Sequence, residues 1–103
     1  MLFKKIILIL VFLTFSSSTF ADDKMALGLE VYNNKAQCGV CHTLQAAGST
    51  GDIGPNLDQL KAQMAQIIAV VTNGIGVMSP WKDILTDEEI EAVAYYVFNS
   101  TNK

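Results

Sequence analysis

The chain has no arginine, only one histidine, two cysteines and two prolines among its 103 residues. Without arginine, and with ten acidic residues against seven lysines, it lacks the basic footprint of a nucleic-acid-binding protein. Two cysteines and one histidine are too few to close a four-ligand zinc site without carboxylates. Repeats, low-complexity tracts and interdomain linkers are also absent after residue 21. These absences favour one small domain whose chemistry depends on very few side chains.

Residues 1–21 have the pattern of a secretory signal peptide. Two lysines form its positive end, an apolar core of ten residues follows at 6–15, and a small, polar exit ends at Ala21. Ten residues are too few to cross a bilayer, because a membrane helix needs about 20. We therefore expect cleavage after Ala21 and a soluble mature domain, 22–103, in a bacterial periplasm. The alternative is an uncleaved signal that anchors the protein to the membrane.

Export changes both the charge and the size of the protein. The expected mature chain of 82 residues keeps all ten acidic residues and five lysines, for a net charge of −5. Such a surface favours partners with a basic docking patch, and salt should weaken their association. A domain of this size gains little surplus stability from its core, so a covalently bound apolar group would help to hold it together.

Residues 38–42 read C-G-V-C-H, the pattern of c-type haem attachment. Two thiols three positions apart lie on one face of a helical turn, where they reach two vinyl groups of a porphyrin. Cys38 and Cys41 are therefore the expected thioether attachments, and His42 can ligate the iron from the proximal side. A thioredoxin-like redox pair would need a βαβ context, which the sequence lacks. A simple disulfide in a small exported domain stays open at this point.

The helical spacing of apolar residues predicts three helices. They cover residues 24–34, about 61–72, and 86–99. The last begins with the capping box T-D-E-E at 86–89, in which threonine caps the helix and glutamate bonds back. Gly28 is costly inside the first helix, so either it allows close helix packing or it frays the helix end.

Two loops contain the other candidate site residues. The glycine-rich loop at 46–54 leads to Pro55, whose carbonyl can accept a hydrogen bond from a metal-ligating histidine. The loop at 74–81 is unusually apolar, and Met78 within it can offer a thioether to iron. Trp81 either sends its indole N–H to a haem propionate or simply closes the core. Without a haem, Pro55 would be an ordinary turn residue and Met78 a core filler.

Together these motifs resemble the small class I c-type cytochromes over roughly residues 28–98. The resemblance rests on C-G-V-C-H, on G-P-N-L after it, on N-G-I-G-V-M before the last helix, and on L-T-D-E-E-I-E-A-V-A-Y-Y-V. It implies an all-α cytochrome c fold, with three to four short helices around one covalently bound haem c. It also implies that Met78 is the distal ligand opposite His42, and that Pro55 accepts the hydrogen bond from His42.

The resemblance also implies how the first and last helices meet. Gly28 and Tyr32 match a pair that crosses the last helix near an aromatic residue, here Tyr96, which favours close packing at the glycine. One departure is Ser79, which follows the expected axial methionine where the family often has proline. The chain also lacks the basic surface of the mitochondrial relatives, so their partners are not expected here.

The expected function is electron transfer without catalysis. A haem with protein ligands on both sides cannot bind substrate, and methionine ligation raises its reduction potential. The short form with H-T-L and G-P-N-L is similar to monohaem cytochromes that accept electrons from periplasmic dehydrogenases, including sulfite-oxidising ones. The alternatives are a haem-bearing subunit of a larger oxidoreductase and an open-site haem enzyme or gas sensor. The lack of a second histidine argues against the last of these.

Overall fold

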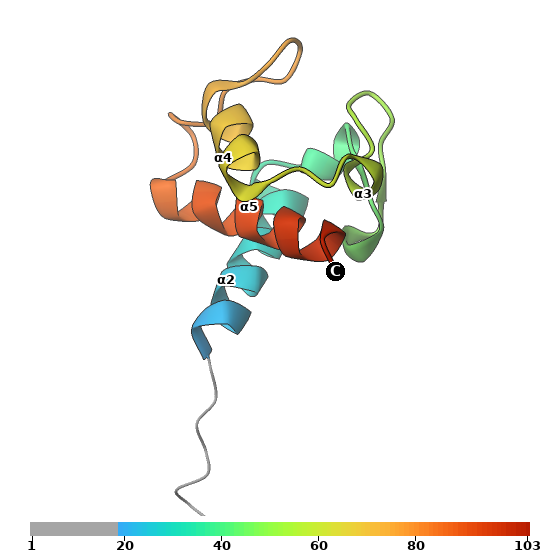
Figure 1. Cartoon of the computed structure of the whole chain (residues 1–103). Coiled ribbons are helices and arrows are strands. Elements are labelled where there is room, and N and C mark those ends of the chain that lie inside the picture. Colours follow the sequence, from blue (N-terminus) through green and yellow to red (C-terminus); the bar gives the residue numbers. More distant parts are fainter. Residues whose placement is uncertain (1–18) are drawn as a thin grey trace, which may run out of the picture.

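The computed structural model describes residues 19–103, which contain four α-helices and a small two-stranded sheet (Figure 1). The helices are α2 (Thr19–Glu30), α3 (Leu57–Leu60), α4 (Met64–Asn73) and α5 (Asp87–Thr101). The strands β1 (Thr43–Leu44) and β2 (Ser49–Thr50) pair antiparallel, with Thr43 opposite Thr50 and Leu44 opposite Ser49. The predicted all-α class with three to four short helices is confirmed. Most of the expected signal peptide lies in residues 1–18, outside the described residues.

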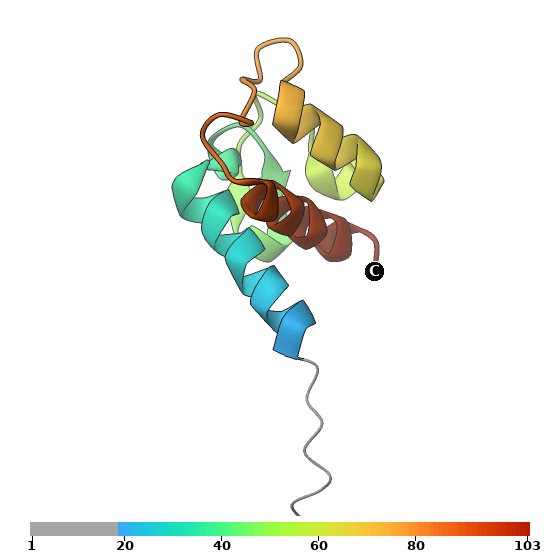
Figure 2. The same ribbon diagram turned by 90° about the vertical axis from the view of Figure 1, so that its left-hand side faces the viewer.

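The first and last helices cross at a point of very close contact (Figure 2). A Cβ atom at Gly28 would lie 2.3 Å from the carbonyl oxygen of Ala92 and 2.5 Å from the Cβ of Tyr96. Beside this point the rings of Tyr32 and Tyr96 pack with their centroids 6.1 Å apart, tilted by 55°. Only glycine allows this approach, so the close-packing explanation of Gly28 is confirmed and the fraying explanation is wrong.

The buried core surrounds this crossing. Its apolar members are Val31, Tyr32, Ala36, Leu44, Val71, Leu85, Ile90, Val93, Tyr96 and Val97. Helix α5 is central, because α2, α3 and α4 all pack against it, while α3 also packs against β1. Among residues 19–103, no helix is both long enough and apolar enough to cross a bilayer.

The first helix differs from its prediction at both ends. The described part of α2 extends back to Thr19, before the predicted start at residue 24. Residues 19–23 are all exposed, so no buried apolar stripe could reveal this part of the helix. After α2 the backbone widens into a π-helical turn, Val31–Lys35, closed by a 2.8 Å bond from the Ala36 N–H to the carbonyl of Val31. The expected cleavage point after Ala21 therefore lies near the start of α2, and cleavage there stays a prediction.

The helix predicted at about 61–72 is present as α4, and it begins three residues later than predicted. A separate short helix, α3, precedes it, and residues 61–63 separate the two. Lys61 ends α3 in the left-handed conformation, with φ 49°, and its N–H donates to the carbonyl of Leu57 at 3.2 Å. The apolar residues of 57–71 follow one helical spacing in the sequence, but α3 packs against both β1 and α5, whereas the main partner of α4 is α5. Tertiary packing therefore determines the break between α3 and α4, and residues 61–63 contain no glycine or proline from which it could be predicted.

The last helix begins as predicted. The Glu89 N–H donates to the Thr86 hydroxyl at 3.1 Å, and the Thr86 N–H donates to the Glu89 carboxylate at 3.0 Å, which confirms the capping box. Glu89 also forms an ion pair with Lys35, in the turn after α2. A second ion pair joins Lys24 of α2 to Glu91 of α5 at 2.7 Å. Both pairs connect the first helical segment to the last one.

Candidate haem-binding site

The C-x-x-C-H motif forms a tight turn shortly after the first helical segment. Cys38–Val40 is a single 3₁₀ turn, and the N–H groups of Cys41 and His42 both donate to the Cys38 carbonyl, at 3.2 and 3.0 Å. Gln37 enters the turn in the left-handed conformation, with φ 50°. The motif is thus wound helically, the conformation in which residues three positions apart share a face.

The two cysteines are free thiols, and both are half-buried. Burial raises the pKa of the Cys38 thiol to about 11. A redox-active cysteine pair depends on a lowered thiol pKa, so this environment argues against thioredoxin-like chemistry. Because the structure joins Cys38 and Cys41 by no disulfide, it gives no support to the disulfide alternative either.

His42 follows the turn with one ring nitrogen already engaged. Its Nδ1 lies 2.8 Å from the carbonyl oxygen of Pro55. A neutral imidazole with its proton on Nδ1 donates to this carbonyl and keeps the lone pair of Nε2 available. Metal-ligating histidines commonly have this arrangement, in which a backbone carbonyl fixes the tautomer. The predicted contact between His42 and Pro55 is present, and iron ligation by His42 stays a prediction.

Gly54 packs directly against the His42 ring. A Cβ atom at this glycine would lie 2.5 Å from the Cε1 and 2.9 Å from the Nδ1 of the ring. The Gly54 N–H also donates to the Cys41 carbonyl at 2.7 Å, which ties the loop to the motif. Sequence reasoning missed this contact, and its only signal was the density of glycines before Pro55.

The loop that contains Met78 is fixed by a short backbone bridge. Ile75 and Met78 exchange N–H to carbonyl bonds of 3.1 and 2.9 Å, and Gly74 and Gly76 on this loop have φ values of 72° and 57°. Met78 is half-buried against the core, whereas its neighbour Val77 is 91% exposed. Met78 is therefore the side chain that this loop packs inward.

Trp81 closes the base of the same loop. Its backbone N–H donates to the carbonyl of Val71 at 2.9 Å, and its half-buried side chain packs against the core. Trp81 therefore packs against the core, which is one of the two roles expected for it. A bond from its indole N–H to a haem propionate stays a prediction.

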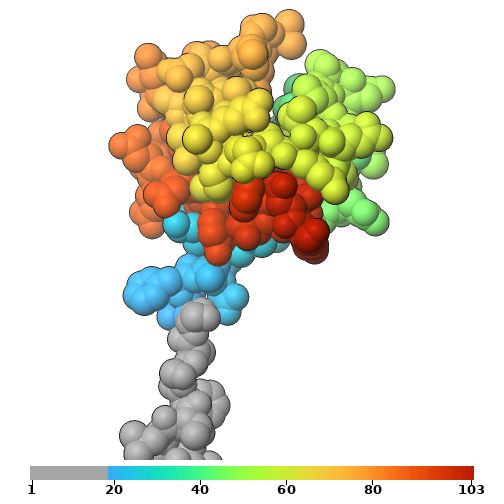
Figure 3. Space-filling model, in the orientation of Figure 1, coloured from blue at the N-terminus to red at the C-terminus, as the bar shows by residue number. Residues whose placement is uncertain are grey.

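The two loops rise on the same side of α5 (Figure 1), and the surface between the green and the orange regions is notched (Figure 3). Large apolar side chains are exposed on these loops and on the motif turn: Val40, Ile53, Ile75 and Val77 are each at least 63% exposed. Grouped exposed apolar side chains of this kind mark a binding surface. An available imidazole nitrogen, two thiols, a thioether and apolar walls are a donor set and lining that fit an iron porphyrin.

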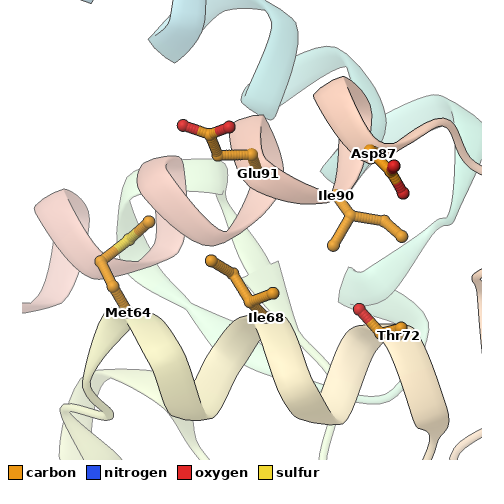
Figure 4. Close-up of a pocket in the computed structure, with 6 residues that line it drawn as sticks. All are labelled: Met64, Ile68, Thr72, Asp87, Ile90 and Glu91. Carbon is orange, nitrogen blue, oxygen red and sulfur yellow. The ribbon is translucent and has the colours of Figure 1, made fainter.

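A separate groove of about 270 Å³ lies between α4 and α5 (Figure 4). Met64 and Ile68 of α4 face Ile90 of α5 across it, and Thr72, Asp87 and Glu91 complete its lining. No residue of the C-x-x-C-H motif lines this groove. Met64 therefore belongs to a helix–helix contact, as its place on the apolar stripe predicts, and is a poor rival of Met78.

Comparison with known proteins decides the family. Residues 23–97 match the sequence profile of the family described as cytochrome c oxidase, cbb3-type, subunit III. Cytochrome c6 of Tetradesmus obliquus is 33% identical over 88 residues, which make up 76% of this chain and 92% of that protein. The chain belongs to the small monohaem class I c-type cytochromes.

Two further relatives show how far the likeness extends. Chloroplastic cytochrome c6 of Chlamydomonas reinhardtii is 35% identical over 98 residues, which cover 85% of the cytochrome and 62% of that relative. The crystal structure of the c-type cytochrome SorU from Sinorhizobium meliloti has 49% sequence identity and a TM-score of 0.75, covering 80% of the cytochrome and 95% of SorU. The predicted cytochrome c fold is confirmed. The cytochrome contains covalently bound haem c and is an electron carrier for redox protein partners rather than an enzyme.

Proposed function

We propose that this cytochrome carries single electrons between redox proteins outside the cytoplasmic membrane. Cys38 and Cys41 attach the haem through thioethers, and His42 and Met78 are its axial ligands. The observation that supports this proposal most directly is the 2.8 Å contact of the His42 Nδ1 with Pro55, because it leaves Nε2 for iron. Haem iron supplies the one-electron chemistry when bound.

The backbone around His42 prepares this residue for ligation. The Pro55 carbonyl fixes the tautomer and makes the imidazole a better donor, while Gly54 limits the tilt of the ring. A ligand held in this way on two sides changes its position little when the charge of the site changes. Such rigidity suits a protein that passes electrons and forms no bond with a substrate.

Met78 closes the second axial position. Its backbone is held by the bridge to Ile75, and its side chain packs inward from an otherwise exposed loop. A thioether ligand favours Fe(II) and so raises the reduction potential. A site with protein ligands on both sides passes electrons and excludes small molecules from the metal.

Electrons enter and leave beside exposed apolar side chains of the motif turn and the Met78 loop, among them Val40 and Val77. Docking at such a patch is small and transient, as in other weak electron-transfer encounters. The acidic surface favours partners with a basic patch, so the association rate should fall as salt is added. We include Trp81 in this site, with its indole N–H directed to a haem propionate.

The electron donor that we propose is a periplasmic dehydrogenase, and a sulfite-oxidising enzyme is the first one to test. Support comes from the short chain with H-T-L and G-P-N-L, and from the 49% identity to SorU. A purified periplasmic sulfite-oxidising enzyme with sulfite should reduce the ferric cytochrome in stopped-flow mixing, more slowly at high salt. Reduction no faster than with sulfite alone would reject this donor.

A permanent subunit of a larger oxidoreductase is the second candidate. The matching family profile is itself described as an oxidase subunit, which is the specific observation in its favour. Purification from the native membrane and periplasmic fractions separates the two candidates. A stoichiometric partner that stays bound in salt supports the subunit, whereas a free monohaem protein supports the carrier.

Expression of the full chain in a bacterium that matures c-type cytochromes tests the proposal as a whole. The mass of the product should equal one haem plus a chain that begins at Asp22. The oxidised spectrum should contain a methionine–iron charge-transfer band, and denaturing gels should retain the haem. A chain that keeps its first 21 residues would contradict cleavage, and an oxidised spectrum without the band would contradict the Met78 ligand.

A further inference from the structure

Three segments of the fold meet at one pair of hydroxyl groups. Tyr32, in the turn after α2, is fully buried, and its hydroxyl lies 2.8 Å from the Oγ of Ser49 in β2. The same hydroxyl lies 3.5 Å from the carbonyl oxygen of His42, and the Ser49 Oγ lies 3.5 Å from the carbonyl oxygen of Leu44. The pair therefore connects the helix crossing to the two backbone carbonyls on either side of Thr43.

The two hydroxyls can arrange their protons in two ways. One arrangement ends on the carbonyl of His42, the last residue of the motif, and the other on the carbonyl of Leu44, two residues later. In one, Ser49 donates to Tyr32, and Tyr32 donates to the carbonyl of His42. In the other, Tyr32 donates to Ser49, and Ser49 donates to the carbonyl of Leu44. Removing either hydroxyl leaves the other without its partner in a partly buried place, which costs more than the bond alone.

The surrounding packing gives this pair little freedom. A Cβ atom at Gly39, inside the C-x-x-C-H motif, would lie 2.6 Å from the Cβ of Ser49 and 3.5 Å from the Cε1 of Tyr32. Strand β2 therefore lies directly on the motif turn. The Tyr32 ring is in turn held by Tyr96 of α5. A continuous support thus runs from α5 through both tyrosine rings and Ser49 to the backbone of His42.

We propose that Tyr32 and Ser49 are positioning residues for the axial histidine, because their hydroxyl pair holds the peptide from which His42 projects. This inference rests on the proposed role of His42 as an iron ligand. Pro55 and Gly54 hold the imidazole ring itself, whereas the hydroxyl pair holds its backbone. Packing at the helix crossing needs only the ring of Tyr32, which phenylalanine would supply equally well, so the hydroxyl serves the site.

The test uses the haem-loaded protein with Tyr32→Phe, Ser49→Ala and the double variant. The amides of His42 and Gly54 bond within the motif, and their native-state hydrogen exchange reports its local opening. Each single variant should speed this exchange about tenfold. The double variant should be no faster than either single one, because both remove the same pair. In NMR spectra of the oxidised protein, the His42 ring protons give signals that the ferric iron shifts. The positions of these signals should change in all three variants.

Tyr96→Phe is the matched control, since it removes a phenol hydroxyl from the same aromatic pair. It should leave exchange at His42 and Gly54, and the His42 ring signals, at wild-type values. Unchanged exchange in Tyr32→Phe and Ser49→Ala would overturn the inference, and so would additive effects in the double variant. Equal acceleration by Tyr96→Phe would also overturn it, because general packing would then be the cause.

Two further outcomes keep the inference separate from the function on which it rests. If Tyr32→Phe fails to take up haem, amide exchange in Ser49→Ala alone tests the inference. Ser49 is only half-buried, and its loss leaves the helix crossing intact. If the wild-type oxidised protein lacks the methionine–iron band, the assignment of Met78 as an iron ligand fails. The comparison of exchange rates at His42 then still decides whether the hydroxyl pair holds this segment.

Discussion

At the scale of single residues, Met78 determines whether the haem site is closed or open. Met78→Ala should abolish the methionine–iron band, turn the ferric haem high-spin and allow added cyanide to bind quickly, because alanine offers no donor atom. Absorbance spectra of the oxidised protein with and without cyanide measure all three effects.

Met64→Ala is the matched control for this substitution. Met64 is half-buried and lines the groove between α4 and α5, so its loss should leave the oxidised spectrum unchanged while lowering stability by less than the roughly 2 kcal/mol of a fully buried methionine. A band that survives Met78→Ala and disappears in Met64→Ala would transfer the axial role to Met64.

The contacts of single residues differ in how well the sequence foretells them. Pro55 could be paired with His42 because a metal-ligating histidine commonly donates to a backbone carbonyl and the family resemblance implies this proline, and the 2.8 Å contact is present. The contact of Gly54 with the imidazole ring and that of Ser49 with Tyr32 could not be foretold. Both depend on the path of the loop in space, which composition alone does not determine.

At the scale of elements, the crossing of α2 and α5 depends on the missing side chain of Gly28. Helix propensity alone predicts that Gly28→Ala stabilises the protein by about 1 kcal/mol. The added methyl group would, however, meet the backbone carbonyl of Ala92, and overpacking of this kind costs roughly 1–3 kcal/mol. We expect a net loss of stability, measured by denaturant unfolding of the haem-loaded protein.

The exposed Ala26 in the same helix provides the control. Ala26→Gly should destabilise by about 1 kcal/mol through propensity alone. If Gly28→Ala were stabilising by a similar amount, helix propensity would govern both sites and the close crossing would be wrong.

The break between α3 and α4 makes a second prediction at this scale. Lys61 holds a left-handed conformation that costs a residue with a Cβ roughly 1–2 kcal/mol. Lys61→Gly should therefore raise the free energy of unfolding relative to Lys61→Ala, which removes the charge but keeps the strain. Urea titrations of the two haem-loaded variants measure the difference, and equal stabilities would contradict the strained turn.

Element boundaries were the weakest part of the sequence-based description, and the reason is physical. The apolar spacing of 57–71 is continuous in the sequence, yet its first part packs against β1 as well as α5, and Lys61 separates α3 from α4. The capping box at Thr86 was predictable, because both of its partners lie within one helical turn. An interaction between residues within one helical turn can be predicted from the sequence, whereas one that depends on a residue far away in the chain cannot.

At the scale of the whole molecule, the order of the motifs predicts the arrangement better than any one motif does. The haem-attachment turn, the loop before Pro55, the Met78 loop and the last helix occur in an order that fits one fold, and the TM-score of 0.75 to SorU agrees. Local propensity, capping and packing at Gly28 all favour the same structure. Their agreement is why the fold could be predicted although α3 was not predicted as a helix of its own.

The ion pair of Lys35 and Glu89 connects the first helical segment to the last and makes the stability depend on pH. The hydrogen bond from Lys35 lowers the pKa of Glu89 below its ordinary value of 4.5, and a bond from the Thr86 backbone adds to this. The same hydrogen bond raises the pKa of Lys35 above its ordinary value of 10.5. A lowered carboxyl pKa contributes stability above 4.5 that is lost as pH falls through the folded value.

Glu89→Gln should therefore lower the free energy of unfolding at pH 7 and flatten its decline below pH 4.5. Glutamine keeps the capping box, so the loss reports the ion pair and not the cap. Glu88→Gln removes the same charge from an exposed position in the same turn and should keep the acid decline of the wild type. On the alkaline side the Lys35 contribution is complete below 10.5 and should fade as pH rises through the raised folded value. An acid decline equally steep in Glu89→Gln and Glu88→Gln would show that other carboxylates control acid unfolding.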